Sequence, residues 1–382
     1  MISKVFFENF VDFCTYSHYN NRMNVTKVIL TNFRNYHAQT VEFCPSLNII
    51  EGHNTAGKTN LIESVYLCGV GKSPRTTKDR EMIRMGEDEA HVTLLVDKKH
   101  RSHRVDIHLM PGGKKIAVDG VSISRFSELM GVVNVVFFAP DELKIIKSDP
   151  QERRRFVNIS LCQQSKPYYA ALSNYNRVLD NRNAIIKEAD SIADLEHLLP
   201  DWNMQMAEEG AKIILTRIHF LHHLQHIADP IHRAIAGPDC DLLLQYSQPD
   251  WSDYPSVYEH LMQQLTSNYK KELALRYTVS GPHRDDFDIL SEQKSLRAYG
   301  SQGQQRTAAL ALKLAEISYF EEATGEKPIL LLDDVLSELD ASRRRALLQA
   351  TDGIQTLLTC TEFTEENVSV GKRIHIQHGQ AT

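Results

Sequence analysis

The sequence predicts an α/β fold in which a strand-rich core is interrupted by a mainly helical insertion. Short alternating apolar runs occupy residues 25–50 and 91–138, with turn residues between them, which is typical of short strands. Between residue 168 and about residue 275, apolar residues recur at helical spacing. The α/β character then returns, with a strand expected at 276–281, a long helix at 302–323 and a strand at 328–334.

The composition excludes several classes of protein. The chain has 382 residues, of which 42% are hydrophobic and 24% charged, so it can bury a large core and is not a disordered chain or a fibrous rod. The net charge, 43 − 49 = −6, argues against a uniformly basic nucleic-acid-binding protein. No run approaches the roughly 18–20 apolar residues of a membrane span, so no membrane association is expected. The six cysteines contain no CxxC pair, which favours reduced thiols in the cytoplasm over a disulfide framework.

Residues 52–59 read GHNTAGKT and fit the phosphate-binding loop pattern, with Gly52, Gly57, Lys58 and Thr59 in the defining positions. The apolar run LNIIE precedes this segment and TNLIESVYL follows it, so the loop joins a predicted strand to a predicted helix. Glycines there let backbone N–H groups surround phosphate oxygens, and the helix N-terminus adds partial positive charge. Lys58 is expected to reach the β- and γ-phosphates and Thr59 to ligate Mg²⁺. The alternative, a glycine-rich turn with an unrelated lysine, does not explain the order of strand, loop and helix.

Residues 329–334 read ILLLDD, which predicts a buried parallel strand with acids at its C-terminal end. Asp333 is the candidate for holding Mg²⁺ through its hydration shell, and Asp334 the candidate for polarising the attacking water. An ordinary strand followed by an acidic turn would look the same, and the phosphate-binding loop elsewhere in the chain favours the catalytic interpretation.

Two further segments could serve the same site. The stretch YGSQGQQR at 299–306 places Ser301, Gln302 and Gly303 at a predicted helix start, where a hydroxyl and free backbone donors can bind an anion. The stretch SELD follows the acidic strand, and its Asp340 could equally be the N-cap of the next helix.

In this order the motifs resemble those of ABC-type P-loop ATPase heads of the SMC and DNA-repair class, and most closely the RecF family. GHNTAGKT resembles the Walker A motif, YGSQGQQ the signature motif, ILLLDD the Walker B motif and SELD the D-loop. The resemblance extends from Met23 to about residue 375 and rests on these stretches: LTNFRNY, GHNTAGKTNLIESVYL, GKSPRT, FFAPDELKIIKSDPQERRRF, SGPHRDDF and YGSQGQQRTAALALKLAE.

The resemblance implies a role for each matching residue. ATP would be bound by Gly52, His53, Asn54, Thr55, Ala56, Gly57, Lys58 and Thr59, with Asn32 and Arg34 near the phosphates. Mg²⁺ would be held by Thr59 and Asp333, and catalysis would use Lys58, Asp333 and Asp334. Ser301, Gln302 and Gly303 would contact the γ-phosphate bound by a second protomer, with Asp340 at the dimer seam. ATP would therefore drive formation of a homodimer, and hydrolysis would release it.

The resemblance also implies domain limits and has departures. The expected parts are an N-terminal extension at 1–22, an ATPase head at 23–160 and 279–382, and an inserted helical lobe at 161–278. Translation is expected to begin at Met23, or residues 1–22 to be peripheral. Thr359 and Thr361 lie where transporter ATPases have their switch histidine, and no glutamine can be assigned as the Q-loop. Asp334 replaces the usual glutamate and is one methylene shorter, which predicts slow turnover. By resemblance, the ATPase would be stimulated by DNA.

Basic residues cluster in the first part of the chain in spite of the negative total. The cations considered for DNA binding are Arg75, Lys98, Lys99, Arg101, Lys114 and Lys115. Clustered cations on one face can bind phosphates whatever the net charge, although any single cluster is also compatible with an ordinary solvated surface. The resemblance favours duplex DNA.

Two histidine-containing segments are further candidate sites. His219, His222, His223 and His226 have metal-compatible helical spacing, but without a completing cysteine or carboxylate a solvated helix face is favoured. The segment SGPHRDDF contains His283 and Arg284 beside two acids, and its role is left unassigned.

The favoured function is that of an ATP-dependent DNA-binding protein of DNA replication and repair. By resemblance it would bind double-stranded DNA, gapped DNA and single-strand/duplex junctions, and would work with RecR and RecO type mediators to load recombinase in gap repair and the SOS response. One alternative is the nucleotide-binding subunit of an ABC transporter, in which the Walker A lysine and Walker B aspartate are usually far closer than the 275 residues (333 − 58) found here. Another is a scaffold with a relic nucleotide site.

Overall fold

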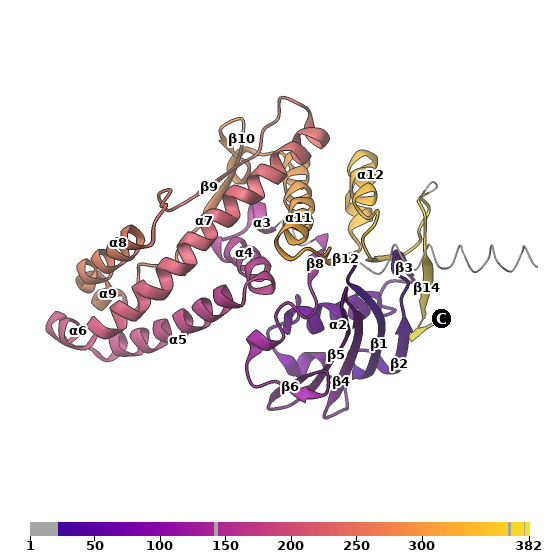
Figure 1. Cartoon of the computed structure of the whole chain (residues 1–382), viewed down its shortest axis with the longest axis horizontal. Coiled ribbons are helices and arrows are strands. Elements are labelled where there is room, and N and C mark those ends of the chain that lie inside the picture. The colour runs from indigo at the N-terminus through magenta and orange to yellow at the C-terminus, as the bar shows by residue number, and fades with distance from the viewer. Residues whose placement is uncertain (1–21, 141–143, 366–367, 378) are drawn as a thin grey trace, which may run out of the picture. The chain divides into compact units, whose positions relative to one another are not determined.

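The computed structural model describes residues 22–140, 144–365, 368–377 and 379–382 (Figure 1). The chain divides into two compact units: Met1–Glu142 with Glu316–Thr382, and Leu143–Ala315. The first unit therefore contains both ends of the chain, and the second is inserted between them. The domain limits at residues 160 and 278 stay predictions, and the expectation for residues 1–22 lies outside the described residues except for Arg22.

The first unit contains an antiparallel sheet of six strands in the order β2-β1-β4-β5-β6-β7. Side chains along β1 and β4 alternate between buried and more exposed positions, so one face packs into the core. The strands are β1 (Asn24–Phe33), β2 (Tyr36–Glu42), β4 (Ala90–Asp97), β5 (Ser102–Met110), β6 (Gly113–Val118) and β7 (Val121–Ser122). The strands expected in residues 25–50 and 91–138 are confirmed.

A second sheet of the same unit has the order β15-β14-β3-β13-β12-β8. Its pairings are parallel except for the hairpin of β14 with β15. The strands are β3 (Leu47–Glu51), β8 (Val135–Phe138), β12 (Ile329–Asp333), β13 (Thr356–Cys360), β14 (Lys372–Gln377) and β15 (Gln380–Ala381). Every residue of β3, β12 and β13 is buried, as expected for strands covered on both faces.

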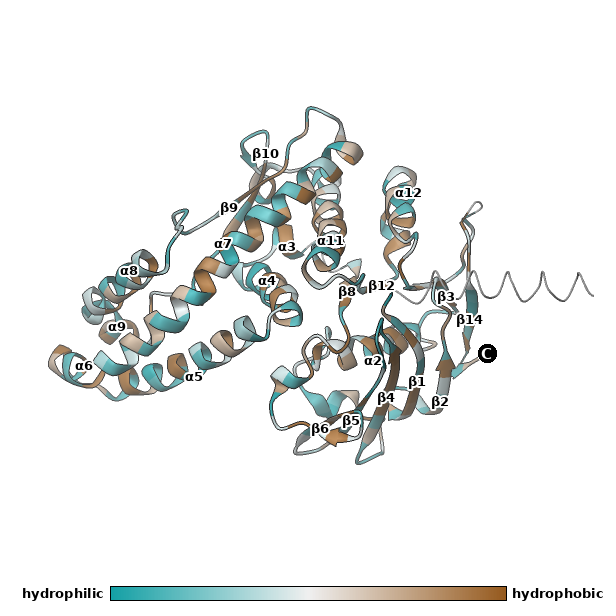
Figure 2. Cartoon of the chain, viewed as in Figure 1, coloured by the Kyte–Doolittle hydropathy of each residue, from teal (hydrophilic) through white to brown (hydrophobic). Residues whose placement is uncertain are grey.

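Helix α2 (Lys58–Val70) contacts strands of both sheets: β1, β4 and β5 of the antiparallel sheet and β8, β12 and β13 of the parallel one. Its apolar residues are buried all round the helix, as expected for a helix enclosed by the core. Figure 2 shows the hydrophobic residues of the adjacent strands in brown. The remaining helical elements of this unit are η1 (Asp79–Met82), η2 (Phe126–Glu128), η4 (Val335–Glu338) and α12 (Ala341–Ala350).

The second unit is mainly helical, and its longest element is α7 (Pro200–Ala236). Helix α7 packs against α5 (Lys166–Glu188) and α8 (Tyr254–Ser267). The other elements are α3 (Lys144–Lys147), α4 (Pro150–Gln164), α6 (Ile192–Leu198), α9 (Tyr269–Leu275), α10 (Leu296–Tyr299) and the strands β9 (Leu243–Tyr246), β10 (Phe287–Ser291) and β11 (Lys294–Ser295). Helix α11 (Gln302–Thr324) begins in this unit and ends in the first.

A fully buried ion pair organises the helical unit. The Arg182 guanidinium of α5 contacts both carboxylate oxygens of Glu272 of α9, at 3.0 and 2.8 Å. Its Nε donates to Asn203 Oδ1 of α7 at 2.9 Å, so one side chain joins three helices. Because both charges have 0% exposed side chains, loss of either partner would leave a buried uncompensated charge.

The strand expected at 276–281 is wrong. Arg276 adopts φ 63° and ends α9, and the following backbone is irregular. Its donors are satisfied by side chains instead of a neighbouring strand, since Thr278 N donates to Asn183 Oδ1 and Val279 N to Glu272 Oε1. The helix expected at 302–323 forms as Gln302–Thr324, and the strand expected at 328–334 forms as Ile329–Asp333.

Candidate nucleotide-binding site

The loop between β3 and α2 needs glycine for steric reasons at two positions. Gly57 has φ 121°, and a Cβ there would lie 2.6 Å from Asn35 Nδ2. Gly52 has φ 155°, and a Cβ there would lie 2.3 Å from the carbonyl oxygen of Ile376. Thr55 is also in the left-handed region, at φ 69°. The pattern that identified the loop therefore corresponds to real backbone requirements.

Lys58 and Thr59 are the first two residues of α2. Lys58 Nζ donates to the carbonyl oxygens of Gly52 at 2.6 Å and His53 at 3.0 Å, so its charge lies inside the curve of the loop. Thr59 Oγ1 donates to Asp333 Oδ1 at 2.9 Å. Residues 274 positions apart in the chain thus meet at the N-terminus of one helix, where an anion is favoured.

Asp333 ends β12 and is only 8% exposed. Its Oδ1 also accepts a hydrogen bond at 2.8 Å from Thr359 Oγ1, at the adjacent strand β13. Thr359 Oγ1 in turn accepts from the backbone N–H of Asp334 at 3.0 Å, and Asp334 has φ 52° with an exposed side chain. Thr359 therefore fixes both acidic residues of the Walker B segment, with one carboxylate buried and the other directed to solvent.

Burial raises the pKa of Asp333 above its ordinary value, and the hydrogen bonds from Thr359 and Thr59 oppose this effect. The site holds Thr59 Oγ1 and a carboxylate oxygen within hydrogen-bond distance of each other, and such hard oxygen ligands suit Mg²⁺. Thr59 and Asp333 fit the metal on these grounds.

Two residues next to β1 support the loop from outside. Asn35 Nδ2 donates to the carbonyl of Ala56 at 2.9 Å, and Tyr36 Oη donates to that of Gly57 at 3.0 Å. Asn60 Nδ2 of α2 donates to Asn35 Oδ1 at 2.8 Å. This supporting role of Asn35 and Tyr36 was not predicted from the sequence, where the Asn-Tyr pair after the first strand is the signal that could have indicated it.

Arg34 lies close to this support but contacts an acid. Its Nη2 and Nε donate to the two carboxylate oxygens of Glu63 at 2.6 and 2.9 Å. Glu63 is 1% exposed on α2, and it also accepts from Ser73 Oγ at 2.5 Å and Arg75 Nη1 at 3.4 Å. Asn32 has φ 50°, and its Oδ1 is buried without a hydrogen-bond partner among the described residues. The sequence did not point to Glu63, because the phosphate-binding loop pattern ends at Thr59 and specifies no residue at position 63.

The remaining motif residues lie at helix starts. Ser301 precedes α11, where its Oγ accepts from Gln304 N at 3.2 Å and its N–H donates to Gln304 Oε1 at 2.8 Å, a reciprocal cap. Gln302 and Gly303 form the first turn of this helix. Asp340 caps α12 by accepting from the backbone of Ser342 and Arg343 at 3.1 and 3.0 Å, and these hydrogen bonds lower its pKa. The structure shows the N-cap that was the alternative for Asp340, and the D-loop role of this residue stays a prediction.

Comparison with known proteins assigns the family. Residues 24–372 match the family model described as the RecF/RecN/SMC N terminal domain. The chain is 42% identical over 363 residues to the DNA replication and repair protein RecF of Agathobacter rectalis, covering 94% of this chain and 98% of that one. It is 44% identical over 344 residues to the protein of the same name from Lachnoclostridium phytofermentans, covering 90% and 94%. The chain belongs to the RecF family.

Solved structures agree with this RecF assignment. The recombination mediator protein RecF-ATP of the RecFOR pathway superposes with a TM-score of 0.87 at 34% identity, covering 94% of this chain and 99% of that one. An Smc head domain from Pyrococcus furiosus matches with a TM-score of 0.54 at 16% identity over 94% of this chain and 95% of that one, a likeness of fold alone. The predicted ABC/SMC-type ATPase head is confirmed.

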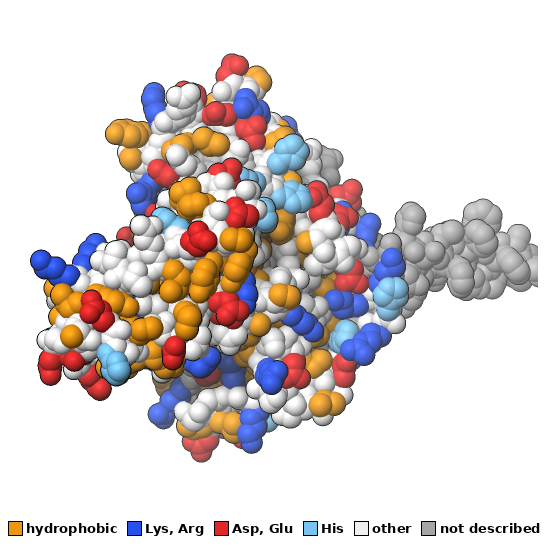
Figure 3. Space-filling view, turned by 60° about the vertical axis from the view of Figure 1, so that its left-hand side comes forward, with side chains coloured by type: hydrophobic (Ala, Val, Ile, Leu, Met, Phe, Trp, Pro, Cys, Tyr) orange, Lys and Arg blue, Asp and Glu red, His pale blue; other side chains and the backbone are white. Residues whose placement is uncertain are grey.

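Most cations considered for DNA binding have acidic partners in this RecF-family chain. Lys98 pairs with Glu326 at 3.1 Å, Lys114 with Asp79 at 2.9 Å, and Arg101 with Asp119 at 3.4 Å, while Arg75 contacts Glu63 as described above. The side chains of Lys99 and Lys115 are exposed and have no ion pair within the described residues. In Figure 3, blue Lys and Arg side chains are interspersed with red acids on the face shown.

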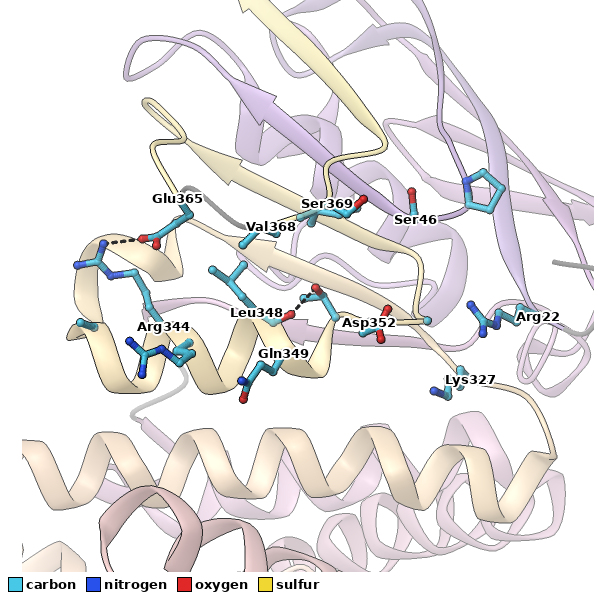
Figure 4. A pocket seen from close by; sticks show the side chains of 16 residues that line it. Arg22, Ser46, Lys327, Arg344, Leu348, Gln349, Asp352, Glu365, Val368 and Ser369 are labelled. Atoms are coloured by element: carbon cyan, nitrogen blue, oxygen red, sulfur yellow. Dashed lines mark hydrogen bonds and ion pairs between the residues drawn. The ribbon is translucent and has the colours of Figure 1, made fainter. Parts of the chain in front are cut away.

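A separate cavity of about 920 Å³ lies in the first unit of this RecF-family chain (Figure 4). It is lined by α12 and by the residues that lead into β3, and four cations face it: Arg22, Lys327, Arg344 and Arg345. Arg344 is paired with Glu365 at 2.9 Å. None of its lining residues belongs to the phosphate-binding loop.

The helices of the described ranges are too short or too polar to span a bilayer.

Proposed function

We propose that this protein is an ATP-dependent DNA replication and repair protein that acts as a recombination mediator. The hydrogen bond of Thr59 Oγ1 to Asp333 Oδ1 carries this proposal, because it joins the Walker A and Walker B segments in one site. The names of the RecF relatives supply the process, DNA replication and repair. The solved structure of RecF with ATP supports ATP as the nucleotide bound.

The chemistry follows from the site residues. Lys58, inside the loop, binds the β- and γ-phosphates, and the N-terminus of α2 adds its partial positive charge. Mg²⁺ held by Thr59 and Asp333 would neutralise charge on the phosphates. Asp334, exposed beside Asp333, polarises the attacking water, and its short side chain suits slow turnover. The resemblance adds that DNA stimulates this turnover.

The site is completed by a second copy of the chain. Ser301, Gln302 and Gly303 of one protomer contact the γ-phosphate bound by the other, and Asp340 lies at the seam between them. What supports this step is the capped start of α11, which presents Ser301 at an exposed helix N-terminus. ATP therefore promotes a homodimer, and hydrolysis reverses it.

The dimer binds double-stranded DNA, gapped DNA and single-strand/duplex junctions in the cytoplasm. It works there with RecR and RecO type mediators to load recombinase during gap repair and the SOS response. The RecFOR pathway named for the solved RecF-ATP structure supports these partners. A transporter subunit is not favoured, because the high-coverage relatives are named as DNA repair proteins.

Sedimentation velocity tests this proposal. Wild type is measured with and without ATP and Mg²⁺, and with and without gapped DNA, beside Lys58→Ala and the matched control Lys72→Ala. Lys72 is an exposed lysine just beyond the end of α2. We expect ATP to convert wild type and Lys72→Ala to dimers, whereas Lys58→Ala remains monomeric.

Thermal unfolding without ATP shows whether Lys58→Ala keeps its fold. A wild-type chain that stays monomeric with saturating ATP, in the presence and absence of DNA, would refute the composite site.

A further inference from the structure

A cluster of two histidines and one glutamate lies on the antiparallel sheet, outside the nucleotide site. His91 of β4 and His108 of β5 are directly opposite each other in the antiparallel pairing, so their side chains share one face of the sheet. Glu89 immediately precedes β4. Within the described residues, this is the group of three in which one ligand atom from each lies within 4.8 Å of the others.

Both imidazoles direct the same nitrogen toward Glu89. His108 Nε2 lies 2.8 Å from Glu89 Oε2, and His91 Nε2 lies 3.6 Å from Glu89 Oε1. The rings stack with centroids 4.0 Å apart and an interplanar angle of 18°. The backbone pairing of β4 with β5 fixes this arrangement, since residues opposite each other in a sheet cannot move apart without breaking the pairing.

The ligand atoms are close enough together to share one small cation. With metal–ligand bonds of about 2.0–2.2 Å, tetrahedral ligand atoms lie roughly 3.3–3.6 Å from one another. The separation of His91 from Glu89, 3.6 Å, falls in that range, whereas that of His108 from Glu89, 2.8 Å, is a hydrogen-bond distance that would lengthen around an ion. Because the two rings are stacked, both side chains must rotate for their Nε2 atoms to meet one ion.

We propose that Glu89, His91 and His108 form a surface site for a divalent transition metal of the zinc class. Two neutral imidazoles with one carboxylate are ligands that Zn²⁺ accepts, whereas Mg²⁺ and Ca²⁺ prefer oxygen ligands alone. The side chains are 47%, 30% and 56% exposed for His91, His108 and Glu89, so the ion can enter and water can complete its coordination. The carboxylate of Glu89 compensates one of the two positive charges of the metal ion.

The flanking positions limit how strongly the site binds. Lys115 of β6 lies opposite His108, and Thr31 of β1 lies opposite His91, so the row across the sheet is Thr31, His91, His108, Lys115. The positive charge of Lys115 opposes a divalent ion, and the exposed setting screens that opposition. The site is distinct from the histidines of α7, of which His219, His222 and His226 are exposed and none belongs to this cluster.

Isothermal titration of the full chain with ZnCl₂ tests the proposal. The titration contains excess Mg²⁺ and no nucleotide, so that oxygen-rich sites such as Thr59 and Asp333 are already occupied. The variants are Glu89→Gln, His91→Gln/His108→Gln, and two matched controls. His103→Gln removes another β5 histidine that contacts a carboxylate, and His222→Gln/His226→Gln removes two exposed histidines of α7.

We expect wild type and both controls to bind one more equivalent of Zn²⁺ than the His91→Gln/His108→Gln variant. Glu89→Gln should weaken that equivalent by about tenfold or more, because even groups that only orient metal ligands are worth about 10- to 100-fold. The melting temperature of wild type should rise with Zn²⁺, and that of the double variant should not.

Equal Zn²⁺ stoichiometry and affinity in wild type and the double variant would overturn the proposal. Loss of the same equivalent in either control would overturn it as well. Glu89 lies before the strand, so Glu89→Gln provides a test that does not depend on the double variant keeping its sheet intact. Failure of this test would leave the ATP-dependent dimer untouched, because the two sites share no residue.

Discussion

Thr359 Oγ1 donates to Asp333 Oδ1 at 2.8 Å while it accepts from the backbone N–H of Asp334 at 3.0 Å. Thr359 lies within β13. It therefore ties the Walker B acids to the neighbouring strand without contributing a titratable group. This arrangement leads to the first two predictions.

Replacing Thr359 by valine keeps its shape and removes the hydroxyl. We expect Thr359→Val to lower the free energy of unfolding by about 1–3 kcal/mol, because a buried carboxylate loses a donor. ATP hydrolysis should fall further than ATP affinity, since Asp334 also loses its backbone partner. Urea unfolding and steady-state ATPase rates check this, with the exposed Thr361→Val as matched control. A Thr359→Val variant that behaves like the control in both measurements would contradict the role given to this hydroxyl.

Replacing Asp333 by asparagine should stabilise the nucleotide-free protein at neutral pH while abolishing hydrolysis. Burial raises the pKa of Asp333, so between its unfolded and folded pKa values the folded chain binds more protons. The contribution of Asp333 to the free energy of unfolding therefore falls as the pH rises between these two pKa values. Each unit by which the folded pKa exceeds the unfolded one corresponds to about 1.4 kcal/mol. We expect Asp333→Asn to unfold at higher urea than wild type at pH 7, with a smaller difference at pH 4. A variant less stable than wild type at pH 7 would show that the threonine hydrogen bonds outweigh burial.

Much of the fold could be predicted because strand and helix periodicities coincide with burial. The strand ending in Asp333 and the helix at 302–324 followed from apolar runs bounded by motif residues. The prediction of a strand at 276–281 was wrong because the β-branched residues there form no strand pairing. Side chains such as Asn183 and Glu272 accept hydrogen bonds from the backbone N–H groups of this segment instead. Asn183 is far from this segment in the sequence, and Glu272 belongs to the preceding helix. The β-propensity of residues 276–281 therefore carries no information about these hydrogen bonds.

The candidate site was predictable where the chemistry is local and was missed where it comes from tertiary packing. Gly52, Gly57, Lys58 and Thr59 form one contiguous pattern with a steric reason for each glycine. Glu63, in contrast, is an unremarkable glutamate in the sequence, and only the fold brings Arg34, Ser73 and Arg75 to it. The local clusters of cations predicted a basic surface, but acids from distant segments, such as Glu326 for Lys98, pair with several of them.

The two unpaired lysines should contribute more to DNA binding than the two paired ones. A lysine that already has a carboxylate partner releases fewer counterions when it meets a phosphate. We expect Lys99→Ala/Lys115→Ala to reduce the steepness of log affinity against log salt by about 1.8, since each phosphate contact contributes about 0.9. The matched control Lys98→Ala/Lys114→Ala should change it much less. Fluorescence anisotropy with gapped DNA and ATP, between 50 and 200 mM salt, measures both slopes. Equal slopes in the two double variants would place the DNA elsewhere on the protein.

His283 should make the helical unit sensitive to acid. It lies in the SGPHRDDF segment, where Tyr175 Oη donates to its Nδ1 at 2.7 Å and its Nε2 donates to the carbonyl of Thr278 at 3.2 Å. The Nδ1 contact requires the neutral ring, because a protonated Nδ1 cannot accept a hydrogen bond. Burial lowers the pKa of His283 to about 4. The hydrogen bonds of His283 therefore connect α5 to the loop that precedes β10.

The sign of the pH effect follows from linkage. Between the unfolded pKa of about 6.5 and the folded value of about 4, the unfolded chain binds a proton that the folded chain does not. The contribution of His283 to the free energy of unfolding is therefore fully present above pH 6.5, and it falls by roughly 3 kcal/mol as the pH drops to 4. His283→Gln should flatten this decline, whereas His226→Gln, an exposed control on α7, should not. Both tryptophans, Trp202 and Trp251, lie in the helical unit, so urea unfolding followed by tryptophan fluorescence at pH 7 and pH 5 reports on it directly. An unchanged pH dependence in His283→Gln would mean that another buried group, such as His232, whose pKa burial also lowers, causes the acid sensitivity.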